Sequence, residues 1–189
     1  MKLLLIAAVI SLSLSAAAQN KFLFSSQNYV GLTEGEHGSK WQLQTINGFK
    51  YKTWFAGIGT GLDWYYQKSI PVFVDITKDI FPNGNRNFFI SADGGINFPW
   101  EDERASYPGY GEAKMLNGLY WGTGIGYKIG IGKRNDAILL QVGYSYKYSG
   151  EKSKPMYILY TPFISSPMEL YDRNDYHLRR LSLKIGWKF

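Results

Sequence analysis

Two short segments place a histidine beside groups with which it can do acid–base chemistry. His37 is followed by Gly38 and Ser39, and Glu34 precedes it by three positions. A histidine that is oriented by a carboxylate can accept the proton of a serine hydroxyl, which makes the serine a nucleophile. This segment is therefore the first candidate for catalysis in the chain.

The second histidine, His177, lies two positions after Asp175. Both histidines also fit a simpler interpretation, as solvated side chains in a loop or at the start of a strand. The chain has two histidines and no cysteine, so we expect no zinc site, no thiol chemistry and no cofactor.

The composition narrows the class of protein. The formal net charge is +6, but no run of lysine and arginine is longer than two, so we expect no nucleic-acid partner. Aromatic residues make up 17% of the chain and glycine occupies 21 positions. That combination is typical of β-proteins with aromatic belts and closely packed strands.

The strongest structural pattern is the C-terminal segment from Tyr176 to Phe189. Its apolar row is Leu181, Leu183, Ile185, Trp187 and Phe189, and its polar row is Arg180, Ser182, Lys184, Gly186 and Lys188. Strict alternation over this length predicts a strand with one apolar and one polar face. A closed barrel leaves such a strand no free edge, and an apolar row on the outside of a barrel needs lipid around it.

Similar alternation recurs along the chain and predicts an all-β, eight-stranded, antiparallel up-and-down transmembrane β-barrel. The predicted strands cover 22–34 (in part), 40–51, 53–67, 70–81, 87–98, 117–131, 137–149 and 176–189. Short connections at 81–86 and 132–136 alternate with long ones at 99–115 and 150–175, which is the pattern of periplasmic turns and extracellular loops. Within the last loop, Met156 to Ile164 is apolar enough for a strand, but Pro155 and Pro162 favour a hairpin or flap above the membrane.

Residues 1–18 have the features of a signal peptide, with Lys2 before an apolar stretch and Ala16 to Ala18 before the expected cleavage site. An N-terminal membrane anchor is the alternative, although the apolar run is shorter than the roughly 20 residues that a span requires. We expect residues 19–189 to form a single barrel domain.

The inward rows of the predicted strands carry charges of opposite sign on opposite walls. The expected lumen charge network is Asp63, Asp75, Asp79, Asp93, Lys128, Lys147, Arg180, Lys184 and Lys188. Asp63 and Lys147 are expected near the outer end, Asp75, Asp93 and Lys184 near the middle, and Asp79, Lys128 and Lys188 near the periplasmic end. Because an eight-stranded barrel is narrow and buried charges must be paired, we expect a lumen plugged by side chains. A gated path for ions or protons is the alternative.

Glycines share these inward rows, in the strands predicted at 53–67 and 117–131. They predict that large inward side chains, including Phe55, Phe73, Phe89 and Tyr120, fold across the lumen. The alternative is a cavity for an apolar ligand.

The whole pattern resembles the small eight-stranded outer-membrane barrels of the OmpX and OmpA-transmembrane kind. This resemblance implies location in the outer membrane of a Gram-negative cell, with outer-membrane lipids and lipopolysaccharide as partners. Its most specific element is the C-terminal strand, whose Ile185, Trp187 and Phe189 would be recognised by the barrel assembly machinery.

Three functions are compatible with such a barrel. The first is a structural or surface-interaction role, in which loop aromatics such as Tyr107, Tyr110, Tyr157 and Tyr160 contact an extracellular partner that the sequence does not identify. The second is lipid A modification, since some eight-stranded barrels are enzymes with a His/Ser pair near the outer surface. The third is a small pore or an apolar-ligand carrier. A soluble barrel of the lipocalin type is the alternative to the membrane assignment.

Overall fold

The protein is a closed antiparallel β-barrel of eight strands with one additional short strand. The computed structural model describes residues 22–100, 113–131, 136–153 and 172–189, so the expected signal peptide lies outside the described residues. The strands are β1 (Leu23–Gly35), β2 (Lys40–Tyr51), β3 (Trp54–Asp63), β4 (Ser69–Asn83), β5 (Arg86–Pro99), β6 (Ala113–Leu116), β7 (Gly118–Gly130), β8 (Ala137–Ser153) and β9 (Asp172–Lys188). None of the described segments is a helix of the length and apolarity needed to cross a membrane.

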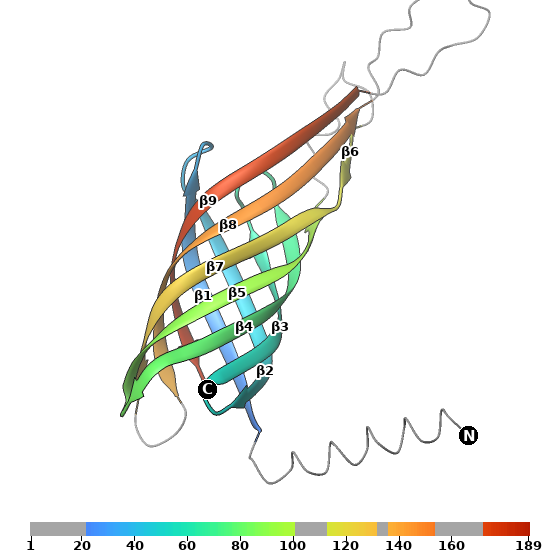
Figure 1. The fold of residues 1–189 in the computed structure, drawn as a ribbon. Helices are drawn as coiled ribbons and strands as arrows, with labels where there is room; N and C mark the ends of the chain where they lie inside the picture. Colours follow the sequence, from blue (N-terminus) through green and yellow to red (C-terminus); the bar gives the residue numbers. More distant parts are fainter. Residues whose placement is uncertain (1–21, 101–112, 132–135, 154–171) are drawn as a thin grey trace, which may run out of the picture.

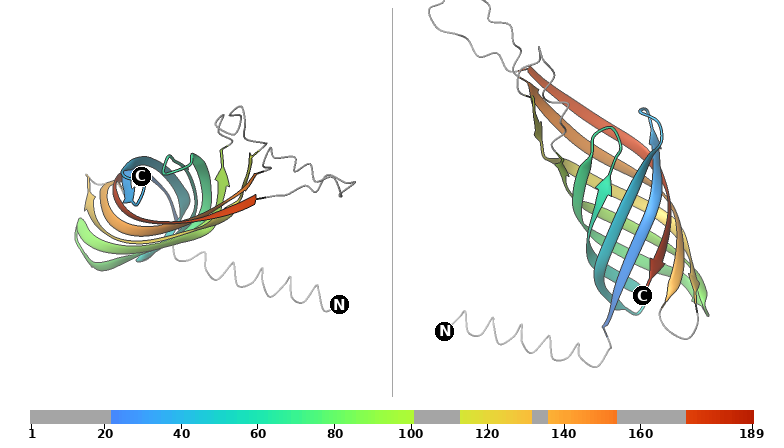
Figure 2. Two further views of the ribbon diagram at one scale, coloured as in Figure 1. Left: turned by 90° about the horizontal axis from the view of Figure 1, so that it is seen from above. Right: turned by 180° about the vertical axis from the view of Figure 1, so that it is seen from behind.

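Closure of the barrel depends on the pairing of the first strand with the last. Val30 of β1 lies opposite Leu43 of β2 on one side and opposite Ile185 of β9 on the other. β9 in turn pairs with β8 along its whole length. The ring of strands that results is seen in Figure 1 and, from above, in Figure 2. The predicted fold class is confirmed.

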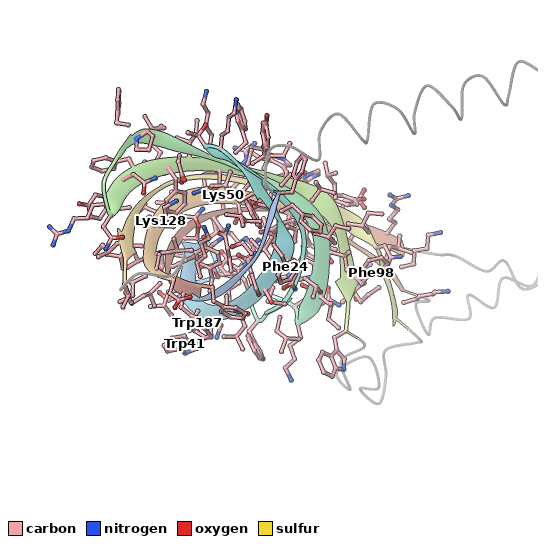
Figure 3. All side chains as sticks on the ribbon, turned by 90° about the horizontal axis from the view of Figure 1, so that it is seen from below. Phe24, Trp41, Lys50, Phe98, Lys128 and Trp187 are labelled. Atoms are coloured by element: carbon pink, nitrogen blue, oxygen red, sulfur yellow. The ribbon has the colours of Figure 1, made fainter. Side chains whose placement is uncertain are left out.

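The alternation of side chains places apolar residues outside and polar residues inside. Along β9, Leu183 is 61% exposed and Ile185 is 56% exposed, whereas Lys184 between them is 6% exposed. Seen from below, Trp41 and Trp187 lie on the outside of the barrel, and Lys50 and Lys128 lie within the ring of strands (Figure 3). This distribution is the reverse of that of a water-soluble protein.

The interior is filled by large side chains that pack against glycines of neighbouring strands. Tyr29, Ile46, Phe55, Phe73, Phe89, Tyr120 and Leu139 form the buried apolar cluster. A Cβ atom at Gly59 would overlap the ring of Phe73, and one at Gly126 would overlap the ring of Phe89. The prediction that inward glycines make room for aromatic rings is therefore confirmed at these positions.

The two ends of the barrel differ in their connections. At one end, which we call the turn end, two-residue turns at 52–53 and 84–85 join strands, and β1 begins and β9 ends there. Gly84 has a φ of 66°, a left-handed conformation that glycine adopts without strain. The opposite end, which we call the loop end, carries the connections 36–39 and 64–68, and β5 and β8 end there while β6 and β9 begin there.

Four predicted boundaries are wrong. The strand predicted over 53–67 ends at Asp63, because the chain turns at Tyr66, whose φ is 61°. Part of the loop predicted over 99–115 is strand β6, which pairs with β8 as a continuation of β7. β8 and β9 are longer than predicted, and at the loop end they extend beyond β1 to β3 (Figures 1 and 2). The predicted hairpin at 156–164 lies outside the described residues.

Candidate functional site

The loop end of the lumen contains a buried cluster around one carboxylate. Oδ2 of Asp63 on β3 pairs with Nη1 of Arg180 on β9 and lies 3.6 Å from Nζ of Lys147 on β8. All three side chains are inaccessible to solvent. Strands that are far apart in the sequence thus bring together three of the residues predicted for the lumen network.

The connection between β3 and β4, residues 64–68, folds inward over this cluster and forms a cap. Lys147 Nζ donates hydrogen bonds to the backbone oxygens of Tyr65 (3.1 Å) and Gln67 (2.9 Å) and to Oγ of Ser69 (2.7 Å). The backbone N–H of Tyr65 donates to Oδ1 of Asp63 (2.8 Å). The cap is therefore held by the same buried ions that it covers.

The cap is also tied to the neighbouring turn and strand. Tyr65 is buried, and its hydroxyl accepts a hydrogen bond from the backbone N–H of His37 (2.9 Å). Its ring lies 5.4 Å from the guanidinium carbon of Arg180. The side chain of Ser149 donates to Oε1 of Gln67 (2.9 Å). Sequence reasoning missed this arrangement, because it treated Tyr65 as part of a straight strand.

The middle of the lumen is arranged differently. Asp75 on β4 lies directly opposite Asp93 on β5, and Thr77 donates a hydrogen bond to Asp75 (2.9 Å). Lys184 donates to Oε1 of Gln44 (2.8 Å), and Nε2 of Gln44 donates to the hydroxyl of Tyr120 (3.1 Å). Among the described residues, Lys184 forms no direct ion pair with either aspartate. The predicted residues share a level of the lumen here, but Lys184 is bonded to the amide of Gln44 and Asp75 to the hydroxyl of Thr77.

The turn end of the lumen contains an aspartate held between two lysines. Oδ2 of Asp79 lies 2.9 Å from Nζ of Lys50, and Oδ1 of Asp79 pairs with Nζ of Lys128. Lys188 lines the same pocket and is buried. Lys50 was not predicted for the network. The alternation of β2 could have identified it, because Trp41, Leu43 and Phe49 face outward and position 50 has the opposite parity.

The two candidate catalytic segments do not form a His–Ser pair in the described structure. The hydroxyl of Ser39 donates to Glu34, and the ring of His37 lies against that of Tyr66 with their centroids 4.5 Å apart. Nδ1 of His177 lies 2.7 Å from the hydroxyl of Tyr146. In the described part of the chain, no three acidic or histidine side chains are close enough together to hold a metal ion.

The part of the β8–β9 hairpin that extends beyond the other strands carries a polar surface cluster. Asp175 accepts hydrogen bonds from the hydroxyl of Tyr148 (2.6 Å) and from Nε of Arg173 (3.0 Å). These bonds, that from Tyr148 first, hold the pKa of Asp175 below its usual range. The cluster is exposed, so the ion pair within it adds little to stability.

The three residues predicted for the assembly signal lie on the outside of the barrel at the turn end. Ile185, Trp187 and Phe189 are all exposed. The backbone of Phe189 is paired with that of Ser26 through two hydrogen bonds, of 2.9 Å and 3.0 Å. The apolar row of β9 thus remains accessible down to its last residue, while the backbone is fully engaged in the sheet.

Comparison with known proteins places the fold among outer-membrane barrels. No protein-family model matches the chain, and no curated protein sequence matches it. The solved structure of Neisserial surface protein A (NspA) matches with a TM-score of 0.55 at 12% identity, covering 88% of this chain and 95% of that one. A major outer membrane protein from Thermus thermophilus gives a TM-score of 0.42 at 10% identity, covering 88% of this chain and 100% of that one. The chain has the fold of the small eight-stranded outer-membrane barrels, as the sequence resemblance implied.

The cluster at the loop end leads to a prediction about stability. Asp63→Asn removes the carboxylate but leaves Arg180 and Lys147 buried, so we expect it to lower the free energy of unfolding by about 3–5 kcal/mol. The measurement is urea unfolding of the refolded barrel in detergent micelles, followed by tryptophan fluorescence. Asp175→Asn is the control, because it removes a carboxylate from an exposed cluster. Equal unfolding midpoints for the two variants would contradict the prediction.

Proposed function

We propose that this protein is an integral outer-membrane barrel with a structural or surface-interaction role and with a lumen that is plugged by its own side chains. The observation that carries the proposal is the reversed distribution of side chains, with aliphatic and aromatic residues outside and ionised residues inside. In water, such an outer surface would expose far more contiguous apolar area than soluble monomers do. Surrounded by hydrocarbon, the same surface is favourable.

The outer surface also supports a particular placement in the bilayer. Exposed aromatic residues occur towards both ends of the strands, among them Phe24, Phe49, Trp54 and Trp187 at the turn end and Trp41, Phe98, Trp100 and Trp121 towards the loop end. Aliphatic side chains such as Ile58, Val74 and Leu183 lie between them. Two aromatic belts around an apolar band are typical of transmembrane barrels. The lipid partners would be outer-membrane phospholipids and lipopolysaccharide.

The difference between the two ends supports an orientation. Bacterial barrels have short turns on the periplasmic side and longer loops outside. The turn end would therefore face the periplasm, and the projecting β8–β9 hairpin would face the exterior. In this orientation, the exposed polar cluster around Asp175 is available to an extracellular partner.

The contacts of the lumen favour a plug over the alternatives of a pore or an apolar-ligand carrier. Aromatic rings occupy the space opposite the inward glycines, and the cap covers the ions at the loop end. Lipid A modification would require a nucleophile joined to its base, whereas Ser39 is bonded to Glu34. The geometry therefore favours the structural role among the functions that the sequence allowed.

A charged substitution on the outer surface tests the membrane location. Ile58→Arg places a cation in the middle of the apolar band, and we expect it to lower stability in lipid vesicles by about 2–4 kcal/mol. Asn174→Arg is the control, because it adds the same charge to the exposed hairpin beyond the band. If the barrel were soluble, Ile58→Arg would be harmless and the wild-type chain would refold in buffer without detergent.

Conductance in planar bilayers tests the plug. We expect the wild-type barrel to show no resolved current steps, because side chains fill the lumen. Lys147→Ala removes the side chain that holds the cap, and we expect it to remain closed as well, because the buried aromatic cluster still fills the lumen below the cap. Lys152→Ala, which changes an exposed lysine of the same strand, is the control. Large steps from the wild-type barrel would show that the lumen is open.

The C-terminal row supports a partnership with the barrel assembly machinery through Ile185, Trp187 and Phe189. Phe189→Ala keeps the backbone pairing with Ser26 but removes the last outward ring. We expect less of this variant than of the wild type to be assembled in the outer membrane of cells, although it refolds equally well in micelles. Phe24→Ala, at the same end on the neighbouring strand, is the control. Equal assembly of the two variants would contradict a role for Phe189 in recognition.

A further inference from the structure

Inside the described part of the barrel, the charges of the loop end and the middle sum to zero when taken together, whereas those of the turn end do not. At the loop end and in the middle, three cationic side chains face three carboxylates: Arg180, Lys147 and Lys184 against Asp63, Asp75 and Asp93. At the turn end, Lys50, Lys128 and Lys188 share a pocket in which Asp79 is the one carboxylate among the described lining residues. Two positive charges are therefore left without a counterion in this pocket.

In the part of the chain that the structure describes, Lys188 is the lysine of this pocket whose positive charge has no partner. It is 5% exposed, and among the described residues no hydrogen-bond acceptor or carboxylate pairs with its ammonium group. Lys50 and Lys128 each direct one hydrogen bond to a different oxygen of Asp79. Because an ammonium group carries three N–H donors, all three lysines retain donors for another acceptor.

Three ammonium groups around one carboxylate repel one another, so an anion that binds between them would lower the electrostatic free energy of the site. We propose that the turn-end pocket binds a phosphate group. A phosphate monoester or inorganic phosphate carries between about one and two negative charges near neutral pH, which offsets most of the uncompensated charge of the pocket. A single carboxylate would neutralise only half of it.

The pocket fits the chemistry of such a ligand in other respects. Phe55 and Phe89 line the pocket together with polar side chains, and Lys50 and Lys128 are partly exposed, so a small anion can reach them from solvent. Each lysine comes from a different strand, β2, β7 or β9. The site does not depend on the membrane assignment, because it lies inside the barrel.

Binding of inorganic phosphate to the full chain tests the proposal. The barrel is refolded in maltoside micelles, which contain no phosphorus, and titrated with inorganic phosphate in a calorimeter, with chloride used to keep the ionic strength constant. We expect saturable binding by the wild type that is weakened about tenfold or more in Lys188→Gln, because a charge-assisted hydrogen bond is lost. Lys52→Gln is the matched control, because it removes an exposed lysine at the same end, and we expect it to bind as the wild type does.

A second variant should change affinity in the opposite direction. Asp79→Asn removes the carboxylate that competes for Lys50 and Lys128, and we expect it to bind phosphate more tightly than the wild type. Resistance of the barrel to unfolding on unheated denaturing gels identifies which variants are folded. Absence of saturable binding by the wild type, or equal affinities of Lys188→Gln and Lys52→Gln, would overturn the proposal.

The phosphate group can come from a soluble molecule or from a lipid headgroup, and competition distinguishes the two sources. Phosphatidic acid is added to the micelles before the titration with inorganic phosphate. Weaker apparent binding of phosphate by the wild type would assign the pocket to a lipid headgroup. Unchanged binding would assign it to a soluble phosphate compound that enters from the turn end.

Discussion

The structure depends on one constraint, which is that closure of the sheet and alternation of the side chains must agree around the whole barrel. Side chains in a strand point to opposite faces in turn, so a shift of one residue in register would exchange the two faces. In β9 such a shift would place Lys184 in the outer row and Leu183 in the lumen. Because β9 pairs with both β1 and β8, the error would spread to both neighbours. The pairing of first and last strands therefore determines which residues meet inside.

The narrow interior also favours inward side chains that complement the strand they face. Where a ring crosses the lumen, the facing strand supplies a glycine, as with Phe73 and Gly59. Some inward charges are paired between strands, as Asp63 is with Arg180. The left-handed backbone conformation of Tyr66 also saves space, because it allows residues 64–68 to fold inward onto Lys147. A straight continuation of β3 would leave these buried ions open to solvent.

Much of this could be predicted from the sequence because alternation is a local property of the chain. The strands, the outward rows and the charged inward rows follow from it. The cap formed by residues 64–68 does not follow from alternation. Asp63, Tyr65 and Gln67 are all buried, as alternation predicts, although the backbone has left the sheet after Asp63. Alternation indicates which side chains are inside, but only contacts distant in sequence, here with Lys147, determine the path of the backbone.

The same limit applies to Lys50. The alternation of β2 predicts that Lys50 points inward. Its ion pair with Asp79, which Lys128 shares, depends on residues of other strands. The sequence predicts that acids on one wall meet bases on the other at matching heights. In the structure, the charges of the loop end and the middle sum to zero only when taken together, and lysine is in excess at the turn end. A barrel built in this way has two chemically different ends, one closed by its own ion pairs and one that attracts anions. This asymmetry arises from where paired strands place individual lysines, and the net charge of the chain does not reveal it.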